Sequence, residues 1–160
     1  MTQPDGLERL WTPWRMAYIS GPDKPAGCPF CEDFTPLLVA RGERVFAVLN
    51  KFPYNPGHVL ICPYRHVADY TDLDSDEVLE LGAFTQKAMH VIRKVSNAHG
   101  FNIGINQGGV AGAGIAAHLH QHVVPRWGGD VNFLPVIGGT KALPQLLSET
   151  RDLIRDAWVD

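Results

Sequence analysis

Three histidines alternate in the segment AAHLHQHVVPRW at residues 116–127: His118, His120 and His122. In an extended chain alternate residues point to the same side, so all three imidazoles would share one face of a strand. A strand rises about 3.3 Å per residue, which puts His118 and His122 roughly 13 Å apart, too far for both to bind one metal ion. Imidazoles act as nucleophiles, as acids or bases and as metal ligands, and this spacing predicts that the three divide these roles.

A glycine-rich loop, QGGVAGAG at residues 107–114, directly precedes the histidines. Glycine lets backbone N–H groups approach an anion closely, and consecutive N–H groups form a concave site that suits phosphate. A merely flexible turn is the alternative. A phosphate cradle beside imidazoles indicates attack on phosphorus by a histidine, in which a covalent phosphoramidate divides one difficult step into two.

The cysteines of GCPFCED, Cys28 and Cys31, have the spacing of a metal or redox pair. Three cysteines in the whole chain are too few for a disulfide framework. A thioredoxin-like pair would stand at a strand-to-helix junction, whereas Pro29 and Pro36 break this segment. Zinc is therefore the better interpretation if two more ligands are found. The third cysteine, Cys62, is expected to be a small buried hydrophobic residue.

The composition bounds the kind of protein. With 160 residues, 45% of them hydrophobic, the chain has the length and core of one domain. A formal net charge of −3 gives no broad basic field, which argues against binding of long nucleic acid but not against a small phosphorylated ligand. Because no apolar run approaches about 20 residues and no signal peptide is recognisable, we expect a soluble, cytoplasmic protein without a membrane segment.

Hydrophobic periodicity predicts the elements that must position these residues. The expected strands are 44–50, 58–64, 101–106 and 118–124, the first two joined as a hairpin by the long loop KFPYNPG. A helix is expected to begin at Asp74, which forms a capping-box pair with Glu77, and to stop at Gly100. A last helix is expected from about Pro144, in its first turn, to Trp158. This pattern indicates an α+β fold with a mostly antiparallel sheet of about five strands.

Several motifs together resemble one family. HLHQHVV is similar to the alternating signature of the histidine triad (HIT) family of nucleotide hydrolases and transferases. The segment VLNKFPYNPGHVLICPYRHV at 48–67 resembles that family's strand-loop-strand, and FNIGINQGGVAGAG at 101–114 resembles its phosphate loop. The similarity covers about residues 28–135. LWTPWRM near the start and HVVPRWGGDVNF after the triad extend it to nearly the whole chain, towards a branch similar to bacterial diadenosine tetraphosphate hydrolases and phosphorylases.

The resemblance implies an organisation and an activity. It implies a single HIT domain over 1–160, with an aromatic arm and linker at 1–27, a core at 28–135 and a C-terminal helix at 136–160, and a sheet extended across a homodimer. It implies cleavage of a nucleoside polyphosphate, with diadenosine tetraphosphate as the expected substrate, at the α-phosphate through a nucleotidyl-histidine. Water and inorganic phosphate both remain open as the second nucleophile.

The resemblance also assigns roles to individual residues. The middle histidine, His120, would be the nucleophile, His122 would hydrogen-bond phosphate or leaving-group oxygens, and His58 would lie near the nucleophile. Asn50 is expected at the ribose, and Asn106 at the opening of the phosphate loop. The full set implied for nucleotide and phosphate binding is Asn50, Asn106, Gln107, Gly112, Gly114 and His122.

Family members with an N-terminal Cys-x-x-Cys hold a structural zinc, and the resemblance transfers this site to Cys28, Cys31, His66 and His118. Two thiolates and two imidazoles form a closed tetrahedral set that leaves no position for an activated water. His118 would then anchor the chain while His120 reacts. Four unrelated residues are the alternative.

Three residues depart from the family pattern or have an open role. Gln121 stands where an apolar residue is usual, and its burial would be costly unless its amide finds partners. Gly114 stands where many relatives have a side-chain donor to phosphate, which leaves the attacking species and the leaving group open. Trp127 would stack on a base, contact a second subunit or pack in the core.

Other functions remain open from the sequence alone. One alternative is hydrolysis of a nucleoside phosphoramidate or an adenylyl conjugate by the same histidine. Another is a nucleotide-binding protein with little turnover, and a weaker one is a metalloenzyme in which His118 and His120 share a catalytic metal. The physiological role and the base preference are not predicted.

Overall fold

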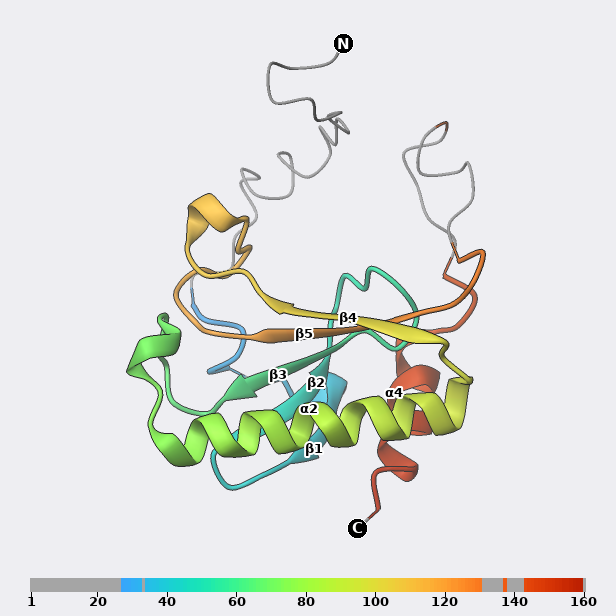
Figure 1. The fold of residues 1–160 in the computed structure, drawn as a ribbon, viewed down its shortest axis with the longest axis horizontal. Coiled ribbons are helices and arrows are strands. Elements are labelled where there is room, and N and C mark those ends of the chain that lie inside the picture. Colours follow the sequence, from blue (N-terminus) through green and yellow to red (C-terminus); the bar gives the residue numbers. More distant parts are fainter. Residues whose placement is uncertain (1–26, 33, 131–136, 138–142, 160) are drawn as a thin grey trace.

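The computed structural model describes residues 27–32, 34–130, 137 and 143–159 (Figure 1). Its centre is a five-stranded antiparallel sheet with the strand order β1-β2-β3-β5-β4. The strands are β1 Leu38–Arg41, β2 Val45–Leu49, β3 Val59–Pro63, β4 Gly100–Ile105 and β5 Gln121–Arg126. The helices are α2 Ser75–Ser96 and α4 Leu147–Asp156, with short 3-10 turns η1 Thr35–Leu37, η2 Tyr70–Asp72 and η3 Gly109–Ala111. The predicted α+β class and antiparallel sheet are confirmed.

The strand predictions were right except at two places. Strand β1 was not predicted, because its four residues lie at the sheet edge and contain an irregularity in their pairing with β2. The strand predicted at 118–124 begins instead at Gln121 and runs to Arg126, so His118 and His120 precede it. In the neighbouring strand β3, residues 59–61 pair with residues 121–123 of β5. The pairing therefore begins at Gln121, and the residues before it have no partner in β3.

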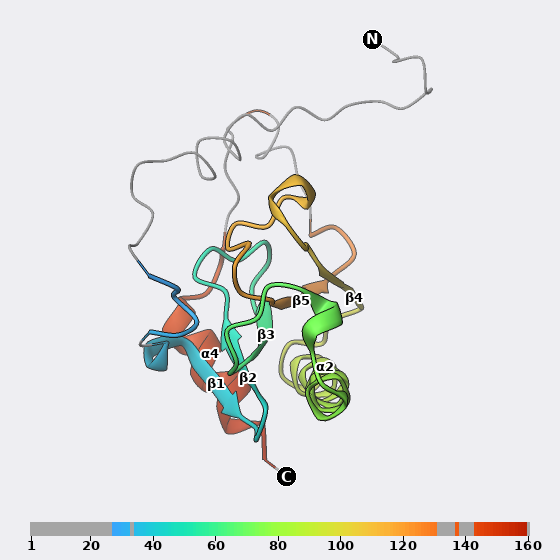
Figure 2. The same cartoon turned by 90° about the vertical axis from the view of Figure 1, so that its left-hand side faces the viewer.

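Both helices cover one face of the sheet, and the loops gather on the other (Figures 1 and 2). Alternation along each strand divides the hydrophobic residues into two clusters, because successive side chains point to opposite faces. The helix-side cluster contains Val45, Ala47, Leu49, Val59, Ile61, Leu81, Ala88, Val91, Ile92, Val123 and Ile154. The cluster on the loop side contains Phe30, Phe46, Val48, Leu60 and Cys62. Cys62 is fully buried, as predicted.

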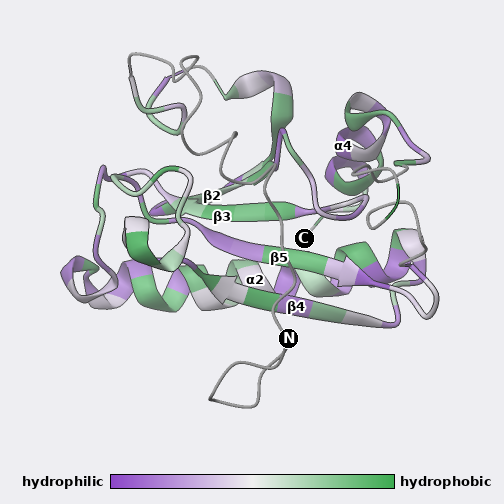
Figure 3. Cartoon of the chain, turned by 90° about the horizontal axis from the view of Figure 1, so that it is seen from above, coloured by the Kyte–Doolittle hydropathy of each residue, from purple (hydrophilic) through white to green (hydrophobic). Residues whose placement is uncertain are grey.

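Strands β3 and β5 differ in hydropathy at the place where the histidines lie. Seen from above, β3 is hydrophobic along its length, whereas β5 is hydrophilic where it begins (Figure 3). That beginning is the pair Gln121 and His122. In the sheet register His122 lies opposite Leu60 of β3 and Gly104 of β4, which places it on the loop face.

Helix α2 begins as predicted. The Asp74 side chain accepts from the backbone N–H of Glu77, and the Glu77 side chain accepts from the N–H of Asp74, which completes the capping box. The predicted stop at Gly100 was wrong: the helix ends at Ser96, because Asn97 adopts the left-handed conformation and closes the last turn. Gly100 instead begins β4.

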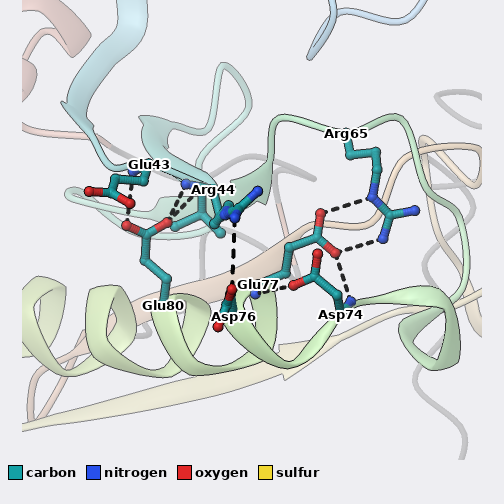
Figure 4. A network of polar contacts seen from close by, with 8 residues as sticks. Glu43, Arg44, Arg65, Asp74, Asp76, Glu77 and Glu80 are labelled. Carbon is teal, nitrogen blue, oxygen red and sulfur yellow. Dashed lines mark hydrogen bonds and ion pairs between the residues drawn. The ribbon is translucent and has the colours of Figure 1, made fainter.

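Acidic side chains of α2 hold the loops at one end of the sheet (Figure 4). The Glu80 carboxylate accepts from three consecutive backbone N–H groups, at residues 43–45, between β1 and β2. The Glu77 carboxylate accepts two hydrogen bonds from the Arg65 guanidinium. Because Arg65 directly precedes His66, this pair fixes the segment that presents His66 to the loop face.

Helix α4 is shorter than predicted. It begins after Leu146, so the expectation that Pro144 lies in its first turn was wrong. Ile154 anchors it in the helix-side cluster, and Trp158 packs on Phe84 of α2. Of the predicted aromatic arm and linker at 1–27, residues 1–26 lie outside the described residues, as does much of 131–142. None of the described helices has the length and hydrophobicity of a membrane span.

Candidate active site

His120 and His122 lie side by side on the loop face, with ring centroids 5.1 Å apart. His118 is fully buried and His120 is 6% exposed, so the side chains of the segment before β5 pack against the rest of the domain. His58, the residue before β3, completes the group: its ring centroid lies 5.1 Å from that of His122. The structure therefore brings together the three histidines expected to do the chemistry.

The hydrogen bonds of His58 define which of its nitrogens carries the proton. Its Nδ1 lies 3.1 Å from the backbone N–H of Tyr54, and an N–H group can only donate. Nδ1 is therefore an acceptor, and neutral His58 carries its proton on Nε2. That Nε2 lies 2.9 Å from Nδ1 of His122 and donates to it, which leaves the proton of neutral His122 on its own Nε2.

Asn50 supports the same hydrogen-bond relay from the end of β2. Its Oδ1 accepts from the backbone N–H of Phe52, which turns its Nδ2 towards Nδ1 of His58 at 3.3 Å. The backbone N–H of Asn50 also donates to the carbonyl of His58. Asn50, expected at the ribose, is therefore placed where it also orients the imidazole behind His122.

Burial and the neighbouring imidazoles of His122 and His120 lower the pKa of His58 to about 3. His58 is 0% exposed, and a positive charge there would lose its hydration and face two further rings. It is therefore neutral at physiological pH and serves as a hydrogen-bond donor rather than as a titrating base.

This shift predicts a loss of stability in acid. The unfolded chain protonates His58 near pH 6.5, whereas the folded chain does so only near pH 3, so stability present above pH 6.5 is lost as the pH falls towards 3. Between pH 6.5 and 4 the effect is up to about 3 kcal/mol. We expect His58→Gln to flatten the fall of Tm over this range, measured by thermal unfolding in a pH series.

The matched control is His90→Gln, which removes an exposed histidine of α2. Both variants keep the predicted zinc ligands Cys28, Cys31, His66 and His118. Any effect of acid on those four residues is therefore common to both variants. An unchanged slope in His58→Gln would show that His58 is not the group that resists protonation.

His120 has the opposite tautomer from His58. Its Nδ1 lies 2.8 Å from the carbonyl oxygen of His118, which can only accept, so Nδ1 carries the proton and Nε2 carries the lone pair. Burial lowers the pKa of His120 and favours this neutral form. A neutral imidazole with a defined lone pair is the form that attacks an electrophile.

Cys28, Cys31, His66 and His118 converge beside the triad. One ligand atom from each lies within 4.8 Å of all the others. Sγ of Cys28 lies 3.2 Å from Nδ1 of His118, and Sγ of Cys31 lies 3.2 Å from Nδ1 of His66. Ligands of a tetrahedral zinc at about 2.0–2.3 Å lie roughly 3.5 Å apart, so the four atoms have the spacing of a metal site.

The protonation of this cluster also suits a cation. Nε2 of His118 donates to the carbonyl of Pro63, which leaves its Nδ1 as a lone pair facing the two sulfurs. In the absence of a cation, desolvation and the neighbouring sulfur of Cys28 raise the pKa of Cys31, because two thiolates repel each other. A bound divalent cation removes that repulsion.

Phe30 joins this cluster to His120 and was not singled out from the sequence. It stands between the two cysteines and is 8% exposed. Its ring packs on His118 edge to face at 5.4 Å and on His120 at 5.1 Å. In the sequence, Phe30 was marked only by its position between the two cysteines. The Cys-x-x-Cys motif does not specify the two inner residues, so it did not predict this contact.

The glycine-rich loop contains the 3-10 turn η3, between β4 and β5. Gly108 and Gly112 have positive φ angles of 80° and 82°, which explains glycine at both positions. The backbone N–H groups of Ala111, Gly112 and Ala113 donate within this turn. The Oε1 atom of Gln107 accepts from the backbone N–H of Tyr70, so this side chain ties the loop to η2.

Two further residues expected to bind nucleotide, Asn106 and Gly114, lie between β4 and β5. Asn106 is half-buried and continues the loop-face row of β4 after Gly104, which pairs with His122. Gly114 is exposed four residues before His118. Neither position carries an ionisable group, so any contact there would be a hydrogen bond.

The two other departures have structural explanations. The amide Nε2 of Gln121 donates to the Thr85 hydroxyl on α2, which removes the cost of its burial on the helix side. Trp127 packs against the helix-side cluster, and its indole N–H donates to the carbonyl of Ser96. The core-packing interpretation of Trp127 is therefore confirmed.

An antiparallel sheet with helices on one face and a row of interacting histidines on the other defines a class of small α+β proteins. This chain belongs to the HIT domain family, whose model matches residues 35–129. The chain is 52% identical to the AP-4-A phosphorylase of Mycobacterium tuberculosis over 98% of this chain and 87% of that protein. It is also 39% identical to the bifunctional bis(5′-adenosyl)-triphosphatase/adenylylsulfatase FHIT of Arabidopsis thaliana, over 53% of this chain and 47% of that one.

Solved structures have the same fold. A zinc-bound histidine triad family protein from Mycobacterium smegmatis superposes with a TM-score of 0.63 and 30% identity, covering 89% of both chains. A hypothetical histidine triad nucleotide-binding protein from Sulfolobus tokodaii superposes with a TM-score of 0.66 and 27% identity, covering 82% of this chain and 91% of that one. The predicted family is confirmed by sequence and by fold.

Proposed function

We propose that this chain is an enzyme that cleaves diadenosine tetraphosphate by phosphorolysis through a nucleotidyl-His120 intermediate. The observation that carries the proposal is the pair of opposite tautomers: a lone pair on Nε2 of His120 next to a proton on Nε2 of His122. Such a pair combines a nucleophile with a donor to the departing oxygen. The 52% identity to a phosphorylase over nearly the whole chain supports the choice of reaction.

In the first step Nε2 of His120 forms a bond to the α-phosphorus, and the bond from that phosphorus to its bridging oxygen breaks. ATP leaves with the electron pair of that oxygen. His122 donates a hydrogen bond from Nε2 to the departing oxygen, held in place by His58 behind it. In the second step an oxygen of inorganic phosphate attacks the same phosphorus, the P–N bond breaks, and ADP forms while Nε2 of His120 regains its lone pair.

The nucleotide would occupy the loop face around these rings. We assign Asn50 to the ribose and the loop-side hydrophobic residues of β2 to the base. Asn106, Gln107, Gly112 and Gly114 would surround the phosphates, with Gln107 positioning the loop through Tyr70 rather than binding phosphate with its own oxygen. The amide donor of the same side chain hydrogen-bonds the Asp69 carboxylate, which supports this division.

A structural zinc would be held by Cys28, Cys31, His66 and His118. The donor set fits, since two sulfurs and two imidazole lone pairs meet at tetrahedral spacing. The ion would tie the Cys-x-x-Cys segment to the chain before His120. Thiolate ligands stay reduced in the cytoplasm, in keeping with a cytoplasmic location.

We propose that the chain acts as one HIT domain in a homodimer whose sheets join at β4. Strand β4 is the last strand of the described sheet, so one of its sides has no strand partner there. Its Ile103 is 45% exposed, which is costly for a strand residue in water. Antiparallel pairing of two copies across a two-fold axis would cover both features.

Hydrolysis is the second candidate. Among the relatives is a bis(5′-nucleosyl)-tetraphosphatase of Schizosaccharomyces pombe, 40% identical over 53% of this chain and 50% of that one. The same adduct at His120 serves both reactions, because only the second nucleophile differs.

The products distinguish the two reactions. We expect incubation with diadenosine tetraphosphate to give ADP and ATP, and only when inorganic phosphate is present, as measured by ion-exchange separation of the nucleotides. AMP and ATP formed without phosphate would establish hydrolysis instead. The absence of any product would reject both and leave nucleotide binding or phosphoramidate hydrolysis.

A further inference from the structure

A row of side chains continues along the loop face beyond the histidines. His122, Val124 and Arg126 alternate along β5 and therefore share one face. Their partners on β4 are Gly104, Asn102 and Gly100, in that order. Since the row advances about 6.6 Å every second residue, Arg126 lies roughly 13 Å along the strand from His122.

A cavity of about 220 Å³ lies over this row. We call it the Tyr54 pocket, and the residues that line it are Tyr54, Asn55, Asn102, Val124 and Arg126. Sites for whole drug-sized ligands begin at about 300 Å³, so this cavity has the size for one base or one sugar. It includes neither His120 nor the four-residue metal cluster and is not used by the reaction as described.

Tyr54 connects the pocket to the reacting groups. Its ring lies nearly parallel to the His122 ring, at 8° and a centroid distance of 5.8 Å, and its centroid is 4.7 Å from that of His58. Tyr54 is nevertheless 49% exposed. An aromatic ring that is supported on one side and exposed on the other is a stacking surface for a base.

The polar residues at the far end of the pocket form a neutral group. Arg126 donates from Nε and Nη2 to both carboxylate oxygens of Asp130, which neutralises its charge. Its Nη1 donates to Oδ1 of Asn102, which turns the Nδ2 donor of Asn102 away from the guanidinium. A compensated charge attracts a phosphate weakly, whereas an amide donor beside an aromatic ring suits the ring nitrogens of a base.

We propose that the Tyr54 pocket is the subsite for the second nucleoside of a dinucleoside polyphosphate, with its base stacked on Tyr54 and its edge near Asn102. This proposal rests on the proposed function, in which the leaving nucleotide departs beside His122. Because Tyr54 packs on His122, a polyphosphate chain that passes His122 leads into the pocket. The pocket thereby selects a leaving group that carries a nucleoside over one that ends in phosphate.

The test compares two substrates that differ only in the second adenosine: diadenosine tetraphosphate and adenosine 5′-tetraphosphate. The readout is the ratio of their kcat/KM values. In Tyr54→Leu we expect this ratio to fall about tenfold, the loss typical of one base stacked on an aromatic ring. Tyr54→Phe should keep the wild-type ratio, and Asn102→Ala, which is remote from the histidines, should lower it several-fold.

Each other outcome overturns the proposal. If Tyr54→Leu reduces kcat/KM equally for both substrates, Tyr54 only positions His122. If Asn102→Ala weakens self-association in sedimentation but keeps the ratio, the pocket faces a second copy of the chain. If the wild-type chain turns over neither substrate, the proposed function fails and this proposal with it, a result distinct from an unchanged ratio in an active enzyme.

Discussion

Replacing His120 by alanine is expected to lower the turnover of diadenosine tetraphosphate by at least a factor of about a thousand. The substitution removes the Nε2 lone pair, and no other described imidazole in the group has the same tautomer: His58 and His122 both carry their proton on Nε2. The measurement is kcat in the presence of saturating phosphate, together with the intact mass of the protein after a rapid quench, which reveals a covalently bound adenylyl group.

The control separates chemistry from binding. The Kd for AMP should change little in His120→Ala, because Asn50 and the relay behind His122 stay in place. An adduct that still forms in this variant would assign the nucleophile to another residue. Tight binding without any adduct in the wild-type chain would instead identify a nucleotide-binding protein with little turnover.

Removal of the proposed zinc is expected to have the second largest effect, this time on stability. A ligand a thousandfold above its Kd stabilises the folded state by about 4 kcal/mol, which for a domain of this length is a Tm change of roughly 10 °C. We expect this loss after dialysis against a chelator and in Cys31→Ala. The measurements are calorimetric Tm and the zinc content per chain.

Cys62→Ala is the matched control, because Cys62 is a buried thiol of β3 outside the cluster. It should retain one zinc per chain even if it lowers Tm through a small cavity. A zinc content unchanged in Cys31→Ala would contradict the assigned ligands. Activity that disappears on chelation while Tm stays constant would favour a catalytic metal shared by His118 and His120.

The sequence was sufficient for those features that depend on local pattern. The capping box of α2, four of the five strands and the burial of Cys62 follow from spacing, propensity and turn residues alone. Strand β1 was missed because four residues with an irregular register give too short a pattern. The convergence of Cys28 and Cys31 with His66 and His118 came from the family resemblance rather than from spacing, since the two pairs are far apart in the chain.

The features that the sequence did not predict depend on contacts between distant residues. The tautomers of His58 and His120 are set by a backbone N–H at Tyr54 and a carbonyl at His118, and a sequence does not specify which backbone group meets a side chain. The contact of Phe30 with His120 has the same origin. The hydrogen bond from the backbone N–H of Tyr70 to the side chain of Gln107 likewise joins two segments far apart in the chain.

The two edges of the sheet differ in their capacity to accept another strand. Strand β1 is four residues long, has an irregular register and is contacted by α4, whose Arg151 donates to the carbonyl of Pro36 just before it. Strand β4 is six residues long and pairs regularly with β5 along its whole length. Short, irregular and covered edges resist strand addition, whereas a regular edge permits it. Within the described residues, β4 is therefore the edge that favours growth of the sheet. In the proposed homodimer the two β4 edges would pair with each other, and the closed pair would not extend into a fibre.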